Sequence, residues 1–182
     1  AGFTLIELMV VFSVMVILSS VGIASFVSYS HSTQVDNSMK ELKTSLYTAR
    51  SRALSQLRDS SCYANGFTGQ GYELKGYQVV MCCTFASCNE IQCNDASNSY
   101  ELQAVYGNPD GSGITNQTCS TKKFSDPNVT ITQNKTTATY FFFASITGAL
   151  TSNVTSGQTP KITIGGYGVT KVASISATGV IQ

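Results

Sequence analysis

The first part of the chain is an unbroken apolar run, after which apolar positions recur with helical spacing. No Asp, Glu, Lys or Arg occurs from position 8 to position 35, which exceeds the roughly 20 residues that a helix needs to cross a bilayer. Beyond this run, apolar residues recur at intervals of four and three, as on one face of a helix that packs against a core. These residues are Val35, Met39, Leu42, Leu46, Ala49, Ala53 and Leu57.

Both patterns indicate one continuous helix from about residue 3 to about residue 57, roughly 80 Å long. Its first half is apolar all round and needs lipid or other chains, whereas its second half is amphipathic and packs on its own domain. Ser19, Ser20 and Gly22 are the weakest helix formers in the apolar half, so local loosening is expected there. We expect this span to stay attached, because a basic leader and a typical signal-peptide cleavage site are missing.

The rest of the chain predicts a β-rich head. Short runs of β-branched and aromatic residues alternate with turn-forming residues. The runs cover residues 77–83, 100–106, 129–132, 139–145, 161–165, 168–176 and 179–182. Residues 108–111 (Asn-Pro-Asp-Gly) form one strong turn signal, and residues 126–128 (Asp-Pro-Asn) form another. Connections this short predict antiparallel pairing of the strands.

The composition and the cysteine content indicate which partners this head would attract and in which compartment it folds. Charged residues make up only 12% of the 182 residues and the net charge is +1, so no global field attracts nucleic acid or anionic lipid. Six cysteines favour disulfides formed outside a reducing cytoplasm. Because no histidine accompanies them, a zinc site fits these cysteines poorly. We expect three disulfides, and six cysteines can be connected in fifteen different ways. The candidate residues are Cys62, Cys82, Cys83, Cys88, Cys93 and Cys119. Cys82 and Cys83 are adjacent on a predicted strand, so they should face opposite sides and take different partners.

The residue pattern favours neither an enzyme nor a cofactor site. His31 is the single histidine, which argues against Ser-His or Cys-His nucleophile systems. It follows the apolar span, where we expect a solvated or interfacial side chain. Acidic residues are scattered singly, and no glycine-rich phosphate loop occurs. A few basic residues are grouped, and we expect them to form a solvated face or salt bridges more than a DNA groove. They are Lys122, Lys123, Arg50, Arg52 and Arg58.

Glu7 stands out, because burying a carboxylate without a partner in an apolar run costs several kcal/mol. The stretch around it, GFTLIELMVV, resembles the N-terminal signature of type IV pilins and type II secretion pseudopilins. The resemblance implies that a dedicated peptidase cleaves after Gly2 and that Phe3 becomes the N-methylated first residue. It also implies that Glu7 neutralises the terminal ammonium of a neighbouring subunit and sets the register of the filament. The alternative for Glu7 is a carboxylate that snorkels near the membrane surface.

By the same resemblance, the apolar half packs in the core of a filament. Ala1 and Gly2 precede the mature end that the signature implies. The filament-core residues that it implies are Phe3, Leu5, Ile6, Leu8, Met9, Val10, Val11, Phe12, Val14, Met15, Ile17 and Leu18.

A second resemblance covers part of the helix and the end of the chain. The stretches SLYTARSRALSQ, FFFASITGAL and ITIGGYGVTKVASISATGVIQ are similar to the pseudopilin H and minor-pilin branch often called GspH/FimT. The residues that carry this similarity are Arg50, Arg52, Ala53, Phe143, Gly148 and Gly179. DNA-binding members of the branch carry arginines around the final glycine, whereas residues 180–182 here contain none. DNA uptake is correspondingly less expected.

The resemblances imply an α+β pilin fold, in which the second half of a long N-terminal helix packs on an antiparallel β-sheet head with disulfides. The expected division is a transmembrane and filament-core half (1–30), an amphipathic half of the same helix (31–58) and a disulfide-bearing β-rich head (59–182).

The function implied is that of a structural subunit of an extracellular type IV pilus that serves adhesion, motility or uptake. The subunit would lie in the bacterial inner membrane and then self-assemble into a helical homopolymer or a mixed pilus. Its expected partners are prepilin peptidase and the pilus or secretion assembly machinery, while no nucleic acid, metal or cofactor is expected. Two alternatives stay open, a minor pseudopilin of a type II secretion system and a DNA-binding minor pilin.

Overall fold

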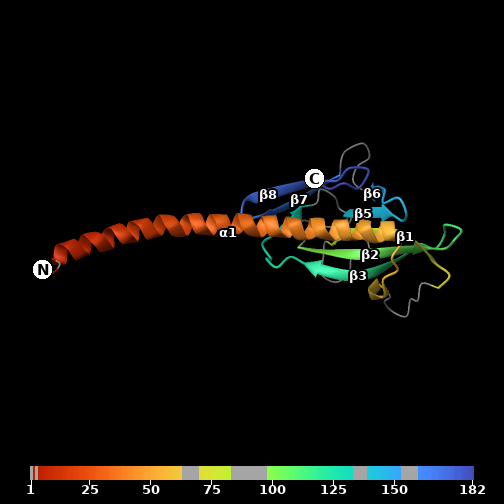
Figure 1. Ribbon diagram of the computed structural model, residues 1–182, viewed down its shortest axis with the longest axis horizontal. Helices are drawn as coiled ribbons and strands as arrows, with labels where there is room; N and C mark the ends of the chain where they lie inside the picture. The colour runs from red at the N-terminus through yellow and green to blue at the C-terminus, as the bar shows by residue number, and fades with distance from the viewer. Residues whose placement is uncertain (1, 3, 63–69, 83–97, 133–138, 153–159) are drawn as a thin grey trace.

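One long helix leads into a head of antiparallel strands (Figure 1). The structure is a computed structural model that describes residues 2, 4–62, 70–82, 98–132, 139–152 and 160–182. Helix α1 (Leu5–Ser55) contains 51 residues and is roughly 75 Å long. It stays α-helical through Ser19, Ser20 and Gly22, so the loosening expected there does not interrupt it. The fold is therefore α+β, with a rod that extends well beyond the head.

Both ends of α1 are capped by local hydrogen bonds. Thr4 has an extended backbone at the N-cap, and its side chain accepts a hydrogen bond from the Glu7 amide. Gln56 takes the left-handed conformation at the C-cap, with φ of 51°, and ends the helix before Leu57. Leu57 is consequently half exposed, and its assignment to the buried stripe was wrong.

The head contains two sheets in which all the described pairings are antiparallel. The five-stranded sheet has the order β3-β2-β1-β5-β6, and the three-stranded sheet has the order β4-β7-β8. The elements after the helix are η1 (Ser60–Cys62), β1 (Glu73–Cys82), β2 (Ser99–Gly107), β3 (Thr115–Lys123), β4 (Thr130–Thr132), β5 (Thr139–Ala144), β6 (Leu150–Ser152), β7 (Lys161–Gly166) and β8 (Val169–Ser174).

Most of the predicted strands are present, with shifted ends. The runs predicted between residues 77 and 176 correspond to β1, β2, β4, β5, β7 and β8. The predicted turn at residues 108–111 joins β2 to β3, with the Gly111 amide donating to the Asn108 carbonyl at 2.9 Å. The strand predicted at 179–182 was wrong, because this segment makes only an isolated bridge, between Ile175 and Ile181. The edge strands β3 and β6 were not predicted.

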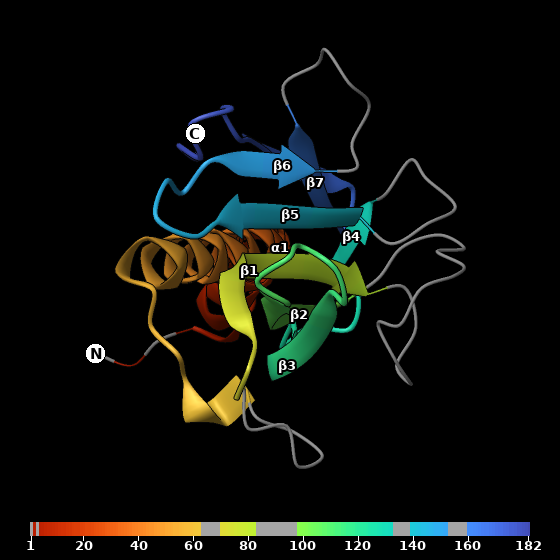
Figure 2. The same cartoon turned by 90° about the vertical axis from the view of Figure 1, so that its right-hand side faces the viewer.

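The core forms where the second half of α1 packs on the two sheets. Figure 2, which looks along the helix, shows α1 beside the middle of the five-stranded sheet. The helix contacts β1 and β5 of that sheet and β7 and β8 of the smaller one. The predicted stripe is buried, with at most 6% of each residue exposed. Its buried members are Val35, Met39, Leu42, Leu46, Ala49 and Ala53.

Aromatic side chains cover the stripe from the sheet side. Tyr77, Tyr100, Phe141 and Phe143 are fully buried in the same core as the stripe. The Tyr100 hydroxyl lies 3.1 Å from the Ser45 hydroxyl, so this buried polar group has a partner on the helix. Burial raises the pKa of Tyr100 to about 12, which keeps the phenol neutral across the physiological range.

Gly76 allows β1 to lie close beside β5, its neighbour in the five-stranded sheet. The register between β1 and β2 shifts between Leu74 and Gly76, as in a β-bulge. A Cβ at Gly76 would collide with the Phe143 carbonyl oxygen and would lie 2.8 Å from the ring of Phe142. The backbone carbonyl cannot move without breaking the pairing of β1 with β5. Only glycine fits this position without a shift of the sheet.

We therefore expect Gly76→Ala to lower the free energy of unfolding by about 3 kcal/mol, as overpacking in a core does. Urea unfolding of the full chain in detergent micelles, followed by circular dichroism, measures the change. Gly107→Ala is the matched control, because the nearest atom to its Cβ would be in the flexible Lys75 side chain, at 3.1 Å. Equal stabilities of the two variants would contradict the close approach.

Candidate functional site

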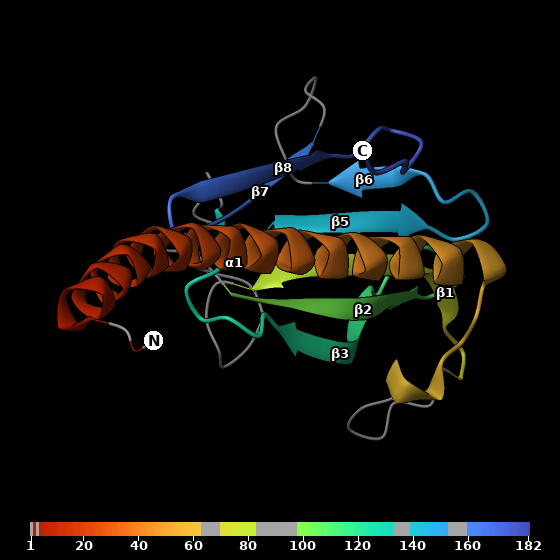
Figure 3. The same cartoon turned by 60° about the vertical axis from the view of Figure 1, so that its left-hand side comes forward.

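The first half of α1 is an apolar surface that nothing in the described head covers. Figure 3 shows this half projecting beyond the strands. Its large apolar side chains are between 43% and 79% exposed. They are Leu5, Ile6, Leu8, Met9, Val10, Val11, Phe12, Val14, Met15, Val16, Ile17, Leu18, Ile23, Phe26 and Val27. Among the described residues, α1 is the one helix long and apolar enough to cross a membrane. Exposed apolar surface on this scale is typical of a membrane or interaction site.

Two serine hydroxyls in this half donate hydrogen bonds to backbone carbonyls of the same helix. The Ser13 hydroxyl donates to the Met9 carbonyl and the Ser20 hydroxyl donates to the Ile17 carbonyl, both at 2.8 Å. A hydroxyl bonded in this way carries no unpaired donor into an apolar surrounding. These two serines therefore do not oppose burial of the rod in lipid or among other helices.

Glu7 lies in the first turn of α1, where its charge also favours the helix locally. The amide of Glu7 donates to the Thr4 hydroxyl oxygen at 3.4 Å. Thr4 and Glu7 have the spacing of a capping box, a signal that is present in the sequence and that the sequence-based expectations missed. A carboxylate at a helix N-terminus is stabilised by about 0.3–1 kcal/mol. Within the described part of the chain, no Lys or Arg forms an ion pair with Glu7.

The residues at the implied cleavage point are only partly described. Gly2 is exposed, and a Cβ built on it would meet no atom within 4 Å. Phe3 lies outside the described residues, as does Ala1.

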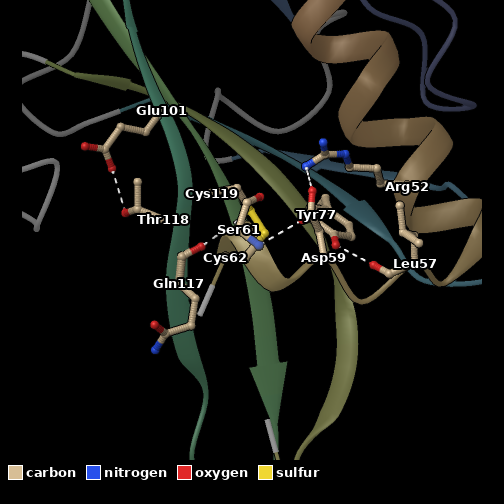
Figure 4. The surroundings of a disulfide bond; sticks show 10 residues. All are labelled: Arg52, Leu57, Asp59, Ser61, Cys62, Tyr77, Glu101, Gln117, Thr118 and Cys119. Atoms are coloured by element: carbon tan, nitrogen blue, oxygen red, sulfur yellow. Dashed lines mark hydrogen bonds and ion pairs between the residues drawn. A yellow bond between two sulfur atoms is a disulfide. The ribbon is translucent and has the colours of Figure 1, made fainter. Parts of the chain in front are cut away.

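The opposite end of the helix is fixed to the sheet by a group of polar contacts and one disulfide (Figure 4). Arg52 pairs with Asp59 at 2.9 Å, and Asp59 accepts a hydrogen bond from the Ser61 amide at 2.9 Å. These bonds lower the pKa of Asp59, with the bonds from Ser61 as the largest cause. The hydroxyl of Tyr77 donates to the Leu57 carbonyl just beyond the helix.

The disulfide joins Cys62 in η1 to Cys119 in β3, with an S–S distance of 2.05 Å. It links residues 57 positions apart, and a closed loop of this size stabilises a fold by about 4 kcal/mol in the entropic description. It also ties the edge strand β3 to the segment that follows the helix.

Of the other predicted disulfide residues, one is described. Cys83, Cys88 and Cys93 lie outside the described residues, while Cys82 is at the end of β1. The expectation that Cys82 and Cys83 take different partners stays a prediction.

The basic residues are divided between the two ends of the head. Lys122 and Lys123 are exposed at the end of β3 that points toward the free half of α1. Arg50 and Arg52 in the last turns of α1, and Arg58 just beyond the helix, lie near the other end of the head (Figure 1). Arg52 pairs with Asp59, and Arg58 donates to the Tyr72 carbonyl at 3.0 Å. The described structure therefore does not gather these five residues into one basic groove.

Arg50 packs between two turns that come from distant parts of the chain. Gly148 and Gly179 have φ of 61° and 77°, a conformation that favours glycine. A Cβ on Gly179 would lie 3.0 Å from the Arg50 Nε atom, and one on Gly148 would lie 3.0 Å from Leu54 and 3.6 Å from Arg50. Both glycines are thus required by backbone conformation and by the close approach of the helix.

No family model matches the chain, and no match to it emerges among curated proteins or solved structures.

The hydrogen bonds from Ser61 to Asp59, together with the ion pair between Asp59 and Arg52, make the helix end sensitive to acid. Because the pKa of Asp59 is lower in the folded state than its ordinary value of 3.8, its stabilising effect is present above that pH and is lost as pH falls through the folded value. We expect Asp59→Asn to cost about 0.5–1 kcal/mol near neutral pH and to flatten the acid dependence below pH 3.8. Urea unfolding of the full chain in detergent at a series of pH values measures both effects. Arg52→Met is the control for the ion pair, since it leaves the bond from the Ser61 amide intact. An unchanged acid dependence in Asp59→Asn would contradict the assignment.

Proposed function

We propose that this chain is the structural subunit of an extracellular filament of the type IV pilus class, held in a membrane by the first half of α1 before assembly. The observation that carries the proposal is that one unbroken helix is packed along one half and bare along the other. A rod that is apolar on all sides cannot be covered by a single head, but it can be covered by lipid or by parallel copies of itself.

Burial of this rod among its copies supplies the cohesion of the filament. Each Å² of apolar surface removed from water contributes about 25 cal/mol, and the free half offers apolar side chains on every side. Transfer from lipid into a helix bundle exchanges one apolar surrounding for another. Assembly therefore depends on close helix packing and on polar groups such as Glu7.

Glu7 gives the bundle its register in this proposal. An ammonium at the start of a neighbouring chain would face the carboxylate in a dry core, where the attraction between opposite charges is far stronger than in water. The sequence GFTLIELMVV supports this role through its resemblance to the pilin signature. The local contact of Glu7 with Thr4 leaves the carboxylate available for a partner, because the bond uses the Glu7 amide.

The head supports a location outside the reducing cytoplasm. The Cys62–Cys119 disulfide fixes the edge of the larger sheet to the end of the helix, and such bonds persist in oxidising compartments. The head would lie on the filament surface and provide contacts with other cells, surfaces or solutes.

A second candidate is a minor pseudopilin of a type II secretion system, and one observation favours it. Arg50, Gly148 and Gly179 carry the resemblance to the pseudopilin H branch, and they meet at one place in the head. In this function the same helix bundling would build a short export piston. The two functions differ in filament length and in the genes beside the coding sequence.

Electron microscopy of surface filaments sheared from cells that produce the chain, with mass spectrometry of the subunit N-terminus, tests the proposal. Long filaments made mainly of this chain, with N-methylated Phe3 at the start, are the expected result. Short structures containing it as a rare component would favour the pseudopilin. A water-soluble monomer with no assembled form would contradict both.

We expect Glu7→Val to leave the subunit in the membrane and to reduce filament yield strongly, because loss of one partner from a buried ion pair costs about 3–5 kcal/mol. Membrane fractionation and quantification of sheared filaments measure the two effects separately. Ser13→Ala is the matched control in the same half, since its hydroxyl bonds within its own helix in the described structure. Normal filament yield from Glu7→Val would show that the carboxylate does not set the register.

A further inference from the structure

Three segments distant in the sequence meet where α1 leaves the head. The ring of His31 stacks on the ring of Tyr167, with centroids 3.8 Å apart and planes 4° from parallel. Tyr167 is at the tip of the turn between β7 and β8, in the left-handed region with φ of 55°. Its hydroxyl donates to Asp126 Oδ2 at 2.7 Å and accepts from Asn128 Nδ2 at 3.0 Å. His31 is therefore not simply solvated, because Tyr167 covers it from the head side.

The turn that carries Tyr167 is held firmly against the helix. Lys171 of β8 pairs with Asp36 of α1 at 3.1 Å, and the neighbouring Val35 is fully buried. The bond to Tyr167 is the largest cause that lowers the pKa of Asp126, so the carboxylate stays ionised as an acceptor. Figure 3 shows the β7–β8 turn at the end of the head from which the free half of α1 emerges. The height of Tyr167 along the helix is thus fixed by the fold.

Tyr29 occupies the same height on the other side of the helix. It is two residues before His31, which corresponds to about 200° of rotation and about 3 Å along the axis. Tyr29 and His31 therefore point to nearly opposite sides, and Tyr167 stacks on the second of them. Tyr29 is 72% exposed and Tyr167 is 41% exposed. Two phenols consequently flank the helix at one level, each with an exposed surface.

This level matches one boundary of a bilayer. From Glu7 to Tyr29 the helix rises about 33 Å at 1.5 Å per residue, while the hydrocarbon core of a bilayer is about 30 Å thick. No charged residue lies between these two positions. When Glu7 lies at one interface, Tyr29 and Tyr167 reach the other.

We propose that Tyr29 and Tyr167 anchor the head in the lipid headgroup layer, with the β7–β8 turn resting on the membrane surface. The phenol ring suits this layer because it has an apolar body and a polar hydroxyl. The inference rests on the membrane-held stage of the proposed function. It adds that the head is orientated by contact with lipid on the side of this turn.

Single-tryptophan reporters test the anchor, because the chain contains no tryptophan of its own. The full chain is reconstituted into phosphatidylcholine vesicles that carry bromine either near the headgroup or deep in the acyl chains. Tyr167→Trp and Tyr29→Trp are expected to lose emission most with the shallow bromines. Phe12→Trp is expected to lose emission most with the deep ones. Ile114→Trp is the solvent control and should be unaffected. Ile114 is 69% exposed and directly precedes β3, which starts on the side of the head away from the free half of α1 (Figure 1).

The outcomes separate the anchor from the membrane stage itself. If Phe12→Trp is quenched while Tyr167→Trp ignores both bromines, the anchor is wrong and the membrane stage stands. If Phe12→Trp is not quenched either, the membrane stage fails. The third outcome is that brominated lipid does not quench Tyr167→Trp and that its emission changes only when copies assemble. The surface around Tyr167 would then contact a neighbouring subunit, and the anchor would be overturned. Tyr29→Trp lies outside the His31 stack, so it reports the same level even if Tyr167→Trp disturbs the turn.

Discussion

Burial of one apolar stripe of α1 is the interaction on which the arrangement depends. From Val35 to Ala53, two sheets meet this stripe with aromatic and aliphatic side chains, and the head has its core there. From Leu5 to Val27 the helix exposes its large apolar side chains, and no strand of the described head covers them. The head therefore buries the second half of α1 only. The first half is left for lipid or other chains to cover. The proposed membrane insertion and the proposed filament assembly would each remove this apolar surface from water.

The features of the fold that local pattern could predict are those with strong periodicity or strong turn chemistry. The buried helical stripe and the hairpin turn at residues 108–111 are of this kind. Strand β3 was missed because its sequence, TNQTCSTKK, has no alternating apolar residues, as an exposed edge strand does not need them. The final residues were taken for a strand because their composition is apolar. In the structure Ile181 packs in the core after a turn at Gly179.

The same distinction applies to the candidate site, where some features could be predicted from the sequence and others could not. The apolar half of α1 and the unusual position of Glu7 follow directly from the sequence, and the capping signal of Thr4 could have been found there too. The stack of His31 on Tyr167 could not, because these residues are 136 positions apart (167 − 31) and meet only through the placement of the β7–β8 turn. Likewise, fifteen disulfide pairings were open until the fold brought Cys62 beside Cys119.

The continuity of α1 has a mechanical consequence. Because the strands run roughly alongside the helix (Figures 1 and 3), tension on the free half would reach the head as a pull parallel to the sheet. Such a pull loads the packed stripe in shear, so its contacts must yield together instead of peeling apart one by one. Behind the stripe, the Cys62–Cys119 bond fastens the chain to β3. The joint between rod and head is strongest along the direction in which a filament under traction would strain it.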